Sequence, residues 1–294
     1  MLAAAPDSER VTVVMLTHNR SEELCRSLAH LLALPEQPLV IVVDNASTDD
    51  TLDCVSARFP QARLVRAERN LGAAGRNLGV EHVRTPYVAF SDDDTWWAPG
   101  SLHTAADLLD GHPDIAVLNA CIAVGPEARP DPACTAMASS PLEAVAGVGP
   151  RLTGFMAGAA VMRTSAFIRA GGYWRAFFIG GEEALLALDI LDANGLIVYA
   201  PALQMHHWPS KARDDGLRRR LIARNGIWTA WLRLPWRLAW RRTLQAVLRL
   251  PTWRLRFQVL ADALREAAAI RSRRRVLRPE TCALLKRVWQ HETQ

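Results

Sequence analysis

The chain has 294 residues, half of them hydrophobic, which is enough to bury a large core and excludes disorder as its main state. Its five cysteines are an odd number without a C-x-x-C pair, so we expect neither a disulfide framework nor a zinc site. Asp7 and Glu9 stand where a secretory signal would need a basic start and an apolar run, so we expect an unprocessed, cytoplasmic protein.

The net charge of +5 combines an acidic part and a basic part of the chain. Residues 1–210 hold 14 Lys and Arg against 24 Asp and Glu, whereas residues 211–294 hold 21 against 6. Six of the ten tryptophans also lie in the basic part. No apolar run reaches the roughly 18 residues that a membrane-spanning helix needs. We therefore place a boundary near residue 210 and expect a tail that can lie on a membrane without crossing it.

Strands and helices alternate along the first hundred residues. This alternation predicts parallel β-α-β units, in which ligands bind at the carboxyl ends of the strands. The polar clusters of this half all follow a predicted strand. The predicted strands are 11–16, 39–43, 63–66 and 87–90, and the predicted helices are 24–34, a segment from 47 onwards, and 76–83.

After residue 100 the pattern weakens, and it becomes clear again only beyond residue 150. Beyond Pro209 it changes to an arginine-rich helical periodicity. The elements predicted here are helices at 101–110, 182–193, 217–242 and 253–275, strands at 115–119 and 196–199, an ordered segment at 153–162, and a turn at Gly171-Gly172.

Three consecutive aspartates, Asp92 to Asp94, directly follow the fourth predicted strand. Like charges this close repel one another unless a cation neutralises them. Mg²⁺ and Mn²⁺ suit such a site, because they bind one or two carboxylates and take substrate phosphates as further ligands. For the triplet alone, an acidic turn that caps the next helix remains an alternative.

Two further polar segments are weaker signals by themselves. The segment from Asn70 to Gly79 places glycines, backbone amides and Arg76 at a helix start, which suits an anion or merely a tight turn. Asp44 ends the second predicted strand, where it can contact a ligand or cap a helix.

Taken together, the motifs resemble the family 2 glycosyltransferases in order and spacing. The resemblance covers residues 10 to 232. In the first half it rests on Val13-x-x-x-Thr17-His18-Asn19-Arg20, Asp44-Asn45-x-Ser47-x-Asp49, Asn70-x-Gly72-x-x-Gly75-Arg76-Asn77-x-Gly79 and Asp92-Asp93-Asp94. In the second half it rests on Gly171-Gly172-Tyr173, Phe177-Phe178-Ile179-Gly180-Gly181-Glu182-Glu183, Tyr199-x-Pro201 and His206-His207.

The resemblance implies an α/β protein with the GT-A fold of nucleotide-diphospho-sugar transferases, a Rossmann-like architecture with a mostly parallel central sheet. It implies a catalytic domain over 10–210, with a nucleotide-binding half (10–100) and an acceptor-binding half (101–210). Residues 211–294 then form a C-terminal helical, basic extension. The implied enzyme is an inverting glycosyltransferase that moves a sugar from a nucleotide-diphosphate donor to an acceptor hydroxyl, with Mn²⁺ or Mg²⁺ as cofactor.

The resemblance also implies roles for single residues. Asp94 is the first choice for metal contact, together with Asp92 and one histidine of the pair, His207. The catalytic base comes from Glu182-Glu183, in which Glu183 stands at the usual aspartate position. The residues that match donor contacts are Thr17, Asn19, Asp44, Arg76, Asn77, Asp92 and Asp93.

Three details qualify these roles. Both glutamates begin a predicted helix, whose dipole favours the ionised form that a base requires. Leu185 stands where relatives of the rhamnosyltransferase type often carry another acid, so neither the donor nor the acceptor is assigned from those relatives. Trp96 and Trp97 either stack on a sugar ring or fill the core.

The acceptor is left open between a saccharide, a lipid-linked sugar and a small molecule, as in polysaccharide, glycolipid or secondary-metabolite glycosylation. The tail is a solvated helical cap or an amphipathic surface for an anionic membrane, which would place the protein on the inner face of the plasma membrane. No nucleic-acid recognition motif accompanies the charge, so we expect no nucleic-acid partner. A catalytically silent nucleotide-sugar-binding protein or scaffold is the alternative function, and a nucleotidyltransferase is a third, although its lysine-bearing amino-terminal loop is absent.

Overall fold

The structure is a computed structural model that describes residues 6–209 and 215–291. The predicted boundary near residue 210, and the first five residues of the segment used to exclude a signal, lie outside the described residues. In the described part of the chain, no helix is both long and apolar enough to cross a membrane.

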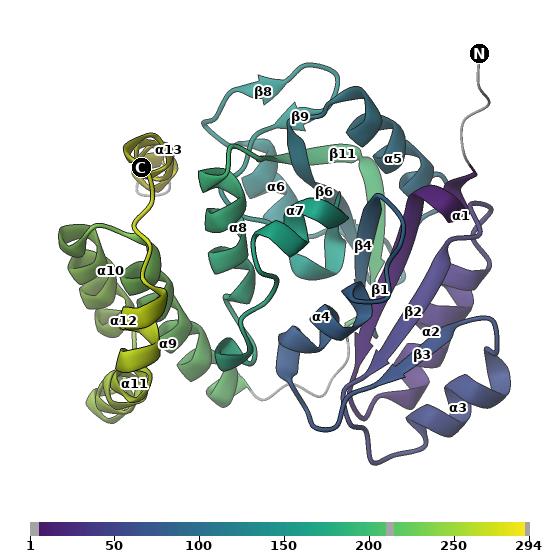
Figure 1. The fold of residues 1–294 in the computed structure, drawn as a ribbon, viewed down its shortest axis with the longest axis horizontal. Helices are drawn as coiled ribbons and strands as arrows, with labels where there is room; N and C mark the ends of the chain where they lie inside the picture. The colour runs from purple at the N-terminus through teal and green to yellow at the C-terminus, as the bar shows by residue number, and fades with distance from the viewer. Residues whose placement is uncertain (1–5, 210–214, 292–294) are drawn as a thin grey trace.

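A central sheet organises the first two thirds of the chain (Figure 1). Its first four strands are parallel to one another, and β10 runs antiparallel between this group and the parallel pair formed by β6 and β11. In spatial order the strands are β3 (Arg63–Arg66), β2 (Leu39–Asp44), β1 (Val11–Thr17), β4 (Tyr87–Asp92), β10 (Ala160–Arg163), β6 (Ile115–Val124), β11 (Leu196–His207) and β5 (Thr95–Trp97). β7 (Arg129–Pro130) pairs with β6, and β8 (Ala144–Val145) with β9 (Gly149–Pro150) forms a separate hairpin.

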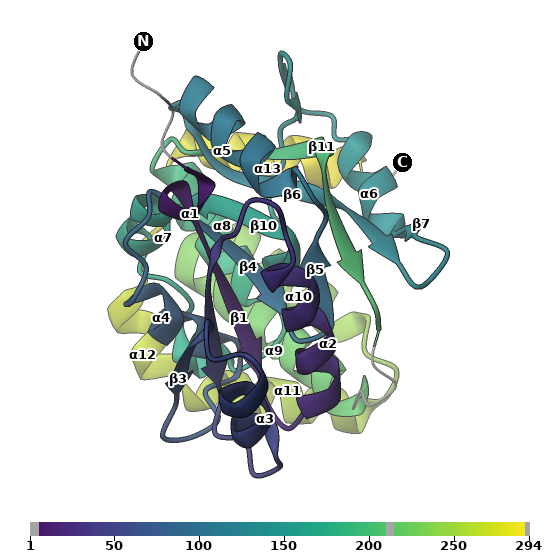
Figure 2. The ribbon, with the colours of Figure 1, turned by 90° about the vertical axis from the view of Figure 1, so that its right-hand side faces the viewer.

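Helices cover both faces of this sheet, as the two views show (Figures 1 and 2). α2 and α3 lie on one side, and α8 lies on the other side next to the C-terminal helices. The helices of this part are α1 (Asp7–Arg10), α2 (Ser21–Leu32), α3 (Thr51–Arg58), α4 (Gly75–Val80), α5 (Ser101–Gly111), α6 (Pro132–Ala138), α7 (Thr164–Arg169) and α8 (Glu182–Asp192), with 3₁₀ turns at Gly72–Ala74, Ala157–Ala159 and Arg175–Phe177.

The C-terminal helices pack on the outer face of α8. Leu185 of α8 shares a buried apolar cluster with Trp228, and Leu188 shares a second one with Ala230. Arg233 adds a buried ion pair to Asp189 of α8, with a 2.8 Å bond from Nη2 to Oδ2. These helices are α9 (Asp215–Arg233), α10 (Trp236–Leu248), α11 (Trp253–Arg265), α12 (Ala267–Arg273) and α13 (Pro279–His291).

Most predicted elements are present, with four differences. The strand expected at 196–199 continues to His207, and a short strand, β5, follows the aspartate triplet. The helix expected at 217–242 is two helices, because Pro235 lacks the N–H that a continuous helix would need and instead caps α10. The segment 253–275 likewise divides into α11 and α12.

The cysteines differ from the expectation as well. Cys25 of α2 and Cys54 of α3 form a disulfide, which the expectation of no disulfide framework did not include. The two helices pack against each other, which brings together residues 29 positions apart in the sequence. Cys121, Cys134 and Cys282 are free thiols.

Candidate active site

A cavity of about 800 Å³ opens at the carboxyl ends of β1, β2 and β4. Thr17 and the aspartate triplet line one side of it, as expected for ligand sites of parallel sheets. The second half of the chain adds further lining residues, including Gly158, Glu182 and His207. The start of α9 closes part of the rim through Leu217 and Arg218. One cavity therefore collects side chains from both halves and from the C-terminal helices.

Asp93 is buried at the centre of a small hydrogen-bonded group with Thr17 and Arg20. Thr17 Oγ1 donates to Asp93 Oδ2 over 3.2 Å, and Arg20 Nη1 donates to Asp93 Oδ1 over 2.9 Å. Burial raises the pKa of Asp93 to about 7, although the Arg20 charge acts in the opposite direction. Arg20 also lies 3.6 Å from Asp94, so one guanidinium serves two carboxylates.

Asp92 turns to a different cation. Its carboxylate forms an ion pair with the buried side chain of Arg76, whose guanidinium also lies 5.8 Å from the ring centre of Tyr173. Burial is the largest influence and opposes the charge on Arg76, but Asp92, Tyr173 and the two glutamates together outweigh it and raise the pKa of the guanidinium. Gly158 completes the packing, because a Cβ there would lie 2.7 Å from Asp92 Oδ2. Arg76 thus stays cationic at the floor of the cavity.

Asp94 lies in the turn between β4 and β5, and His207 ends β11, which pairs with β5. Asp94 Oδ2 and His207 Nε2 are 3.7 Å apart. An oxygen and an imidazole nitrogen at this separation suit a shared Mn²⁺ or Mg²⁺ that takes its other ligands from water and phosphate. The described residues hold no group of three or more side chains already arranged around a metal. Two protein ligands therefore fit the ion, and Asp92 is engaged with Arg76 instead.

His206 points to the other side of β11, because side chains alternate along a strand. Its ring stacks on Trp96 with 5.6 Å between ring centres, and Trp96 stacks in turn on His30 at 4.4 Å. Burial, with a contribution from His30, lowers the pKa of His206. Trp97 is completely buried in the core. His207 therefore lines the cavity, whereas His206, Trp96 and Trp97 do not.

Glu182 and Glu183 begin α8 and both line the cavity. Burial and the neighbouring Glu183 raise the pKa of Glu182 to about 7, and burial also raises the pKa of Glu183. The Arg76 guanidinium opposes both shifts. Two carboxyl groups that interact in this way release their protons in two steps, so one of them changes charge near neutral pH.

Three residues predicted to contact the nucleotide-sugar donor do not line the cavity. Asn19 uses its side-chain oxygen to accept from Thr48 N over 2.7 Å, and Asp44 accepts from Ser47 N over 3.1 Å. Asn77 exchanges two hydrogen bonds with the backbone of Tyr173, at 2.8 and 3.0 Å. In this structure these side chains shape the loops around the cavity, and their donor roles stay a prediction.

Comparison with known proteins agrees with this geometry. Residues 12–171 match the family model "Glycosyl transferase family 2". The chain belongs to glycosyltransferase family 2. It is 28% identical, over 242 residues, to N-acetylglucosaminyl-diphospho-decaprenol L-rhamnosyltransferase of Mycobacterium tuberculosis, an alignment that covers 69% of this chain and 77% of the relative.

Solved structures show the same fold. The complex of S. aureus TarS 1–349 with UDP-GlcNAc gives a TM-score of 0.62 at 18% identity, covering 87% of this chain and 71% of that one. GalNAc-T7 with UDP, GalNAc and Mn²⁺ gives 0.60 at 15% identity, covering 78% of this chain but less than half, 48%, of that one. The predicted GT-A fold is therefore confirmed, and the protein is a glycosyltransferase.

Several residues of this glycosyltransferase were missed as site residues. Asn45 lines the cavity and holds the glycine loop, donating from Nδ2 to Asn70 Oδ1 and Gly72 O over 2.9 and 3.0 Å. The same loop touches the second half, because Ala73 N donates to Phe178 O over 2.6 Å. Phe178 and Ile179 give the opening an apolar edge. Asn45 belongs to the motif Asp44-Asn45-x-Ser47-x-Asp49, and this motif is the sequence signal that could have identified it.

Two side chains of α9 hold the segment that precedes the glutamates. Asn225 is completely buried, and its Nδ2 donates to the carbonyl oxygens of Phe177, Ile179 and Gly180 over 2.9, 3.2 and 2.6 Å. Arg224 Nη2 donates to Phe177 O over 2.9 Å. The sequence carries no local signal for these contacts, since about 45 positions separate the partners.

Some of the buried polar atoms that lack a hydrogen-bond partner among the described residues lie at this site. They include His18 Nδ1, Arg76 Nε, Tyr173 Oη and Glu182 Oε2. Such atoms are uncommon in folded proteins and cost free energy unless a ligand or water satisfies them. Their grouping here indicates that the cavity is shaped for polar ligands.

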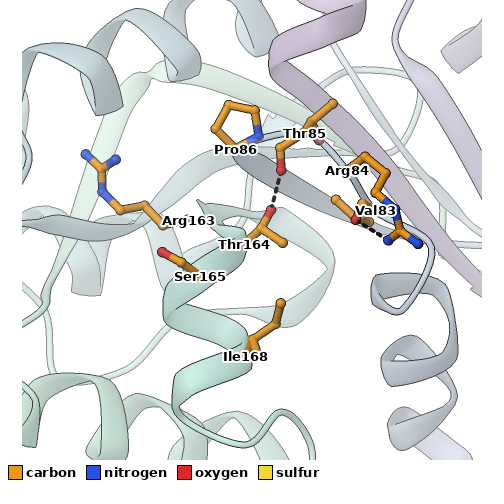
Figure 3. A pocket seen from close by; sticks show the side chains of 8 residues that line it. All are labelled: Val83, Arg84, Thr85, Pro86, Arg163, Thr164, Ser165 and Ile168. Atoms are coloured by element: carbon orange, nitrogen blue, oxygen red, sulfur yellow. Dashed lines mark hydrogen bonds between the residues drawn. The ribbon is translucent and has the colours of Figure 1, made fainter.

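A second hollow, of about 570 Å³, lies at the opposite end of β4 (Figure 3). Thr164 Oγ1 donates there to Thr85 O over 3.0 Å, which ties the start of α7 to the segment before β4. Its lining contains no carboxylate, histidine or cysteine. We therefore assign the chemistry to the larger cavity.

Proposed function

We propose that the protein is an inverting glycosyltransferase that uses a divalent metal and a nucleotide-diphosphate sugar. The observation that supports it most is the convergence of a carboxylate–histidine pair, a buried arginine and a glutamate pair on one cavity. We further propose residues 10–210 as the catalytic domain and 211–294 as the extension, with the division within 10–210 at residue 100.

Asp94 and His207 would hold Mn²⁺ or Mg²⁺ in this proposal. The ion supplies a Lewis acid that neutralises the charge developing on the departing diphosphate. Arg76 lies near the same place and adds a fixed positive charge in a buried environment, where its effect is strong. Asp92 reaches the ion only if its pair with Arg76 opens. Thr17 and Arg20 orient Asp93, which is then placed to accept a hydrogen bond from a hydroxyl of the ribose or sugar.

The glutamate pair supplies the base. An ionised carboxylate takes the proton of the acceptor hydroxyl. At the same time the oxygen of this hydroxyl attacks the anomeric carbon, and the bond from that carbon to the diphosphate breaks on the opposite face. We assign this role to Glu183, with Glu182 as the neighbour that keeps the pair titrating near neutral pH. The positive end of the α8 dipole favours the ionised form at the required moment.

We propose a lipid-linked sugar as the acceptor, on the inner face of the plasma membrane. The name of the mycobacterial relative specifies a diphospho-decaprenol substrate. In this chain, Phe178, Ile179 and Leu217 expose apolar side chains at the opening of the cavity, next to Arg218. Apolar and cationic groups side by side suit a diphosphate attached to a hydrocarbon chain.

The test is thermal melting with UDP, GDP, dTDP or CDP, in the presence and absence of Mn²⁺ or Mg²⁺. A ligand that binds only the native state raises the melting temperature, so one nucleotide should do so in a metal-dependent manner. Glu183→Gln should keep this shift but lose sugar transfer. If Glu183→Gln transfers sugar at a near-normal rate, Glu183 is not the base.

The same measurements separate the competing functions. A silent nucleotide-sugar-binding protein would show the shift in the wild type without any transfer. A nucleotidyltransferase would release pyrophosphate from a sugar phosphate and a nucleoside triphosphate. The absence of a shift with every nucleotide would overturn the donor site itself.

A further inference from the structure

An unusual amount of apolar surface lies exposed on α10 and α11. Trp236, Trp240, Leu244 and Leu248 follow one another at intervals of four residues, so they form one stripe along α10. Trp253, Phe257 and Leu264 form a corresponding stripe along α11. Their side chains are between 57% and 73% exposed, and we call these seven residues the α10–α11 face.

The opposite sides of both helices explain how so much apolar surface stays in solution. Ala239 and Thr243 of α10, and Val259 and Ala263 of α11, are buried where the helices pack on α9. The fold of the extension is thus already supported by one side of each helix. Large apolar patches on an otherwise satisfied fold mark sites of association with a membrane or a partner.

The charges around the face favour one kind of surface. Residues 236–265 contain seven arginines and a single acid, Asp262. Asp262 is buried and bound by Arg220 and Arg265, so it does not offset the exposed arginines. Arg237 lies over the ring of Trp236 and Arg254 over that of Trp253, at 5.2 and 5.7 Å. Each of these tryptophans therefore has a cation beside it.

We propose that the α10–α11 face inserts into the interfacial region of an anionic lipid membrane, with the arginines on the headgroups and the aromatic rings at the acyl boundary. Tryptophan and arginine on one amphipathic helix are suited to this depth. A second copy of the chain is a poor occupant, because two such faces would bring two sets of arginines together. Leucines this exposed gain nothing from the phosphates of a nucleic acid.

This inference deepens the proposed function, because a lipid-linked acceptor lies at such a membrane. α9 joins the two sites. It begins at the cavity, which Leu217 and Arg218 line, and it carries α10 and α11 on its side. Docking through the face would therefore hold the opening of the cavity beside the lipid surface rather than in bulk solution.

The experiment is co-sedimentation of the full chain with vesicles of phosphatidylcholine alone or mixed equally with phosphatidylglycerol. The wild type should bind the mixed vesicles and bind less as salt rises. Trp240→Gln with Phe257→Gln should reduce binding by at least about tenfold, because two aromatic side chains no longer leave water on binding. The matched control, Ile168→Gln with Leu39→Gln, changes two residues that are 61% and 56% exposed elsewhere and should bind as the wild type does.

Equal binding by the double variant and its control would overturn the proposal, as would a wild type that ignores the mixed vesicles. A concentration-dependent dimer that only the Trp240/Phe257 variant loses would assign the face to a second copy, and salt-sensitive RNA binding without vesicle binding would assign it to nucleic acid. The nucleotide-dependent melting shift, measured without vesicles, should be the same in all three proteins. Its loss in all of them, with vesicle binding intact, would count against the donor site and not against the face.

Discussion

The side-chain amide of Asn225, in the C-terminal extension, donates a 2.6 Å hydrogen bond to the carbonyl oxygen of Gly180, two residues before Glu182. Gly180 and Gly181 both have positive φ, at 85° and 83°, so the chain turns sharply there before α8 begins. A turn of this kind is held by its hydrogen bonds rather than by side-chain packing. The extension therefore takes part in placing the glutamate pair.

Replacing Asn225 by Asp should distinguish a role in positioning the glutamates from a role in stabilising the fold. The carboxylate keeps the size of the amide but cannot donate to the three carbonyls, and it is left buried beside them. We expect the free energy of unfolding to fall by about 1–3 kcal/mol. We also expect kcat to fall more than the KM for the nucleotide sugar rises, because the carbonyl groups that Asn225 binds lie directly before the glutamates.

Urea unfolding and steady-state kinetics, both at a temperature where the variant is folded, measure the two effects. Gln258→Glu makes the same chemical change at an exposed position of α11 and serves as control. If Asn225→Asp is destabilised but turns over like the control, α9 stabilises the fold without positioning the base.

A second contact between the halves of the site depends on one glycine. Gly72 has a φ of +59°, and a Cβ at this position would lie 2.0 Å from Phe178 O. Gly72→Ala should therefore destabilise the protein by at least about 1–2 kcal/mol from the backbone conformation alone, and weaken nucleotide binding as the loop shifts. Gly111→Ala, where a Cβ meets nothing within 4 Å, is the control for thermal unfolding. Equal melting temperatures for the two variants would contradict the close approach.

The sequence located the cavity because its contributors follow predictable strands. Thr17 and the aspartate triplet lie at the ends of β1 and β4, and the parallel order of β1, β2 and β4 brings them to one edge of the sheet. The glutamates reach the same cavity from the start of α8. The direction of single side chains was not available in the same way. Asn77 turns to Tyr173, which lies 96 positions away, and only the tertiary fold brings that partner within reach.

For the C-terminal extension, the sequence likewise did not show which side chains pack against the catalytic part. Leu185 was a departure from a motif in the sequence, but in the structure it is buried with Trp228 of α9. An acid at this position would be buried in an apolar cluster, at a considerable cost in free energy. The basic, tryptophan-rich composition predicted helices, yet it could not show which tryptophans would be buried and which exposed.

The two neighbouring histidines offer a direct test of the metal assignment. His207→Ala should raise the Mn²⁺ concentration needed for half-maximal transfer by about 10-fold or more, because it removes one of two protein ligands. His206→Ala should lower the melting temperature by disrupting the stack on Trp96, but leave the Mn²⁺ requirement unchanged. Sugar transfer is measured against Mn²⁺ concentration in both variants. If both need the same Mn²⁺ concentration for half-maximal transfer, His207 is not a ligand of the ion.

The titration of the glutamate pair links activity and stability to pH with opposite signs. The pKa of Glu182 rises from an ordinary value near 4.5 to about 7 in the folded protein. Between these values the folded chain binds protons that the unfolded chain has released, so this group lowers the free energy of unfolding as pH rises from about 4.5 to about 7. Transfer should rise over the same range, because the base must be ionised.

Glu182→Gln removes this coupling and so tests both signs. Relative to the wild type, the variant should become more stable as the pH of urea unfolding is raised from 5 to 7.5. The pH at half-maximal kcat/KM should move downward, because Glu183 no longer ionises beside a second negative charge. Glu280→Gln, on the exposed start of α13, should follow the wild type in both measurements. If the difference in stability between Glu182→Gln and the wild type does not change with pH, the pKa of Glu182 is not raised by folding. The pH dependence of transfer would then have another origin.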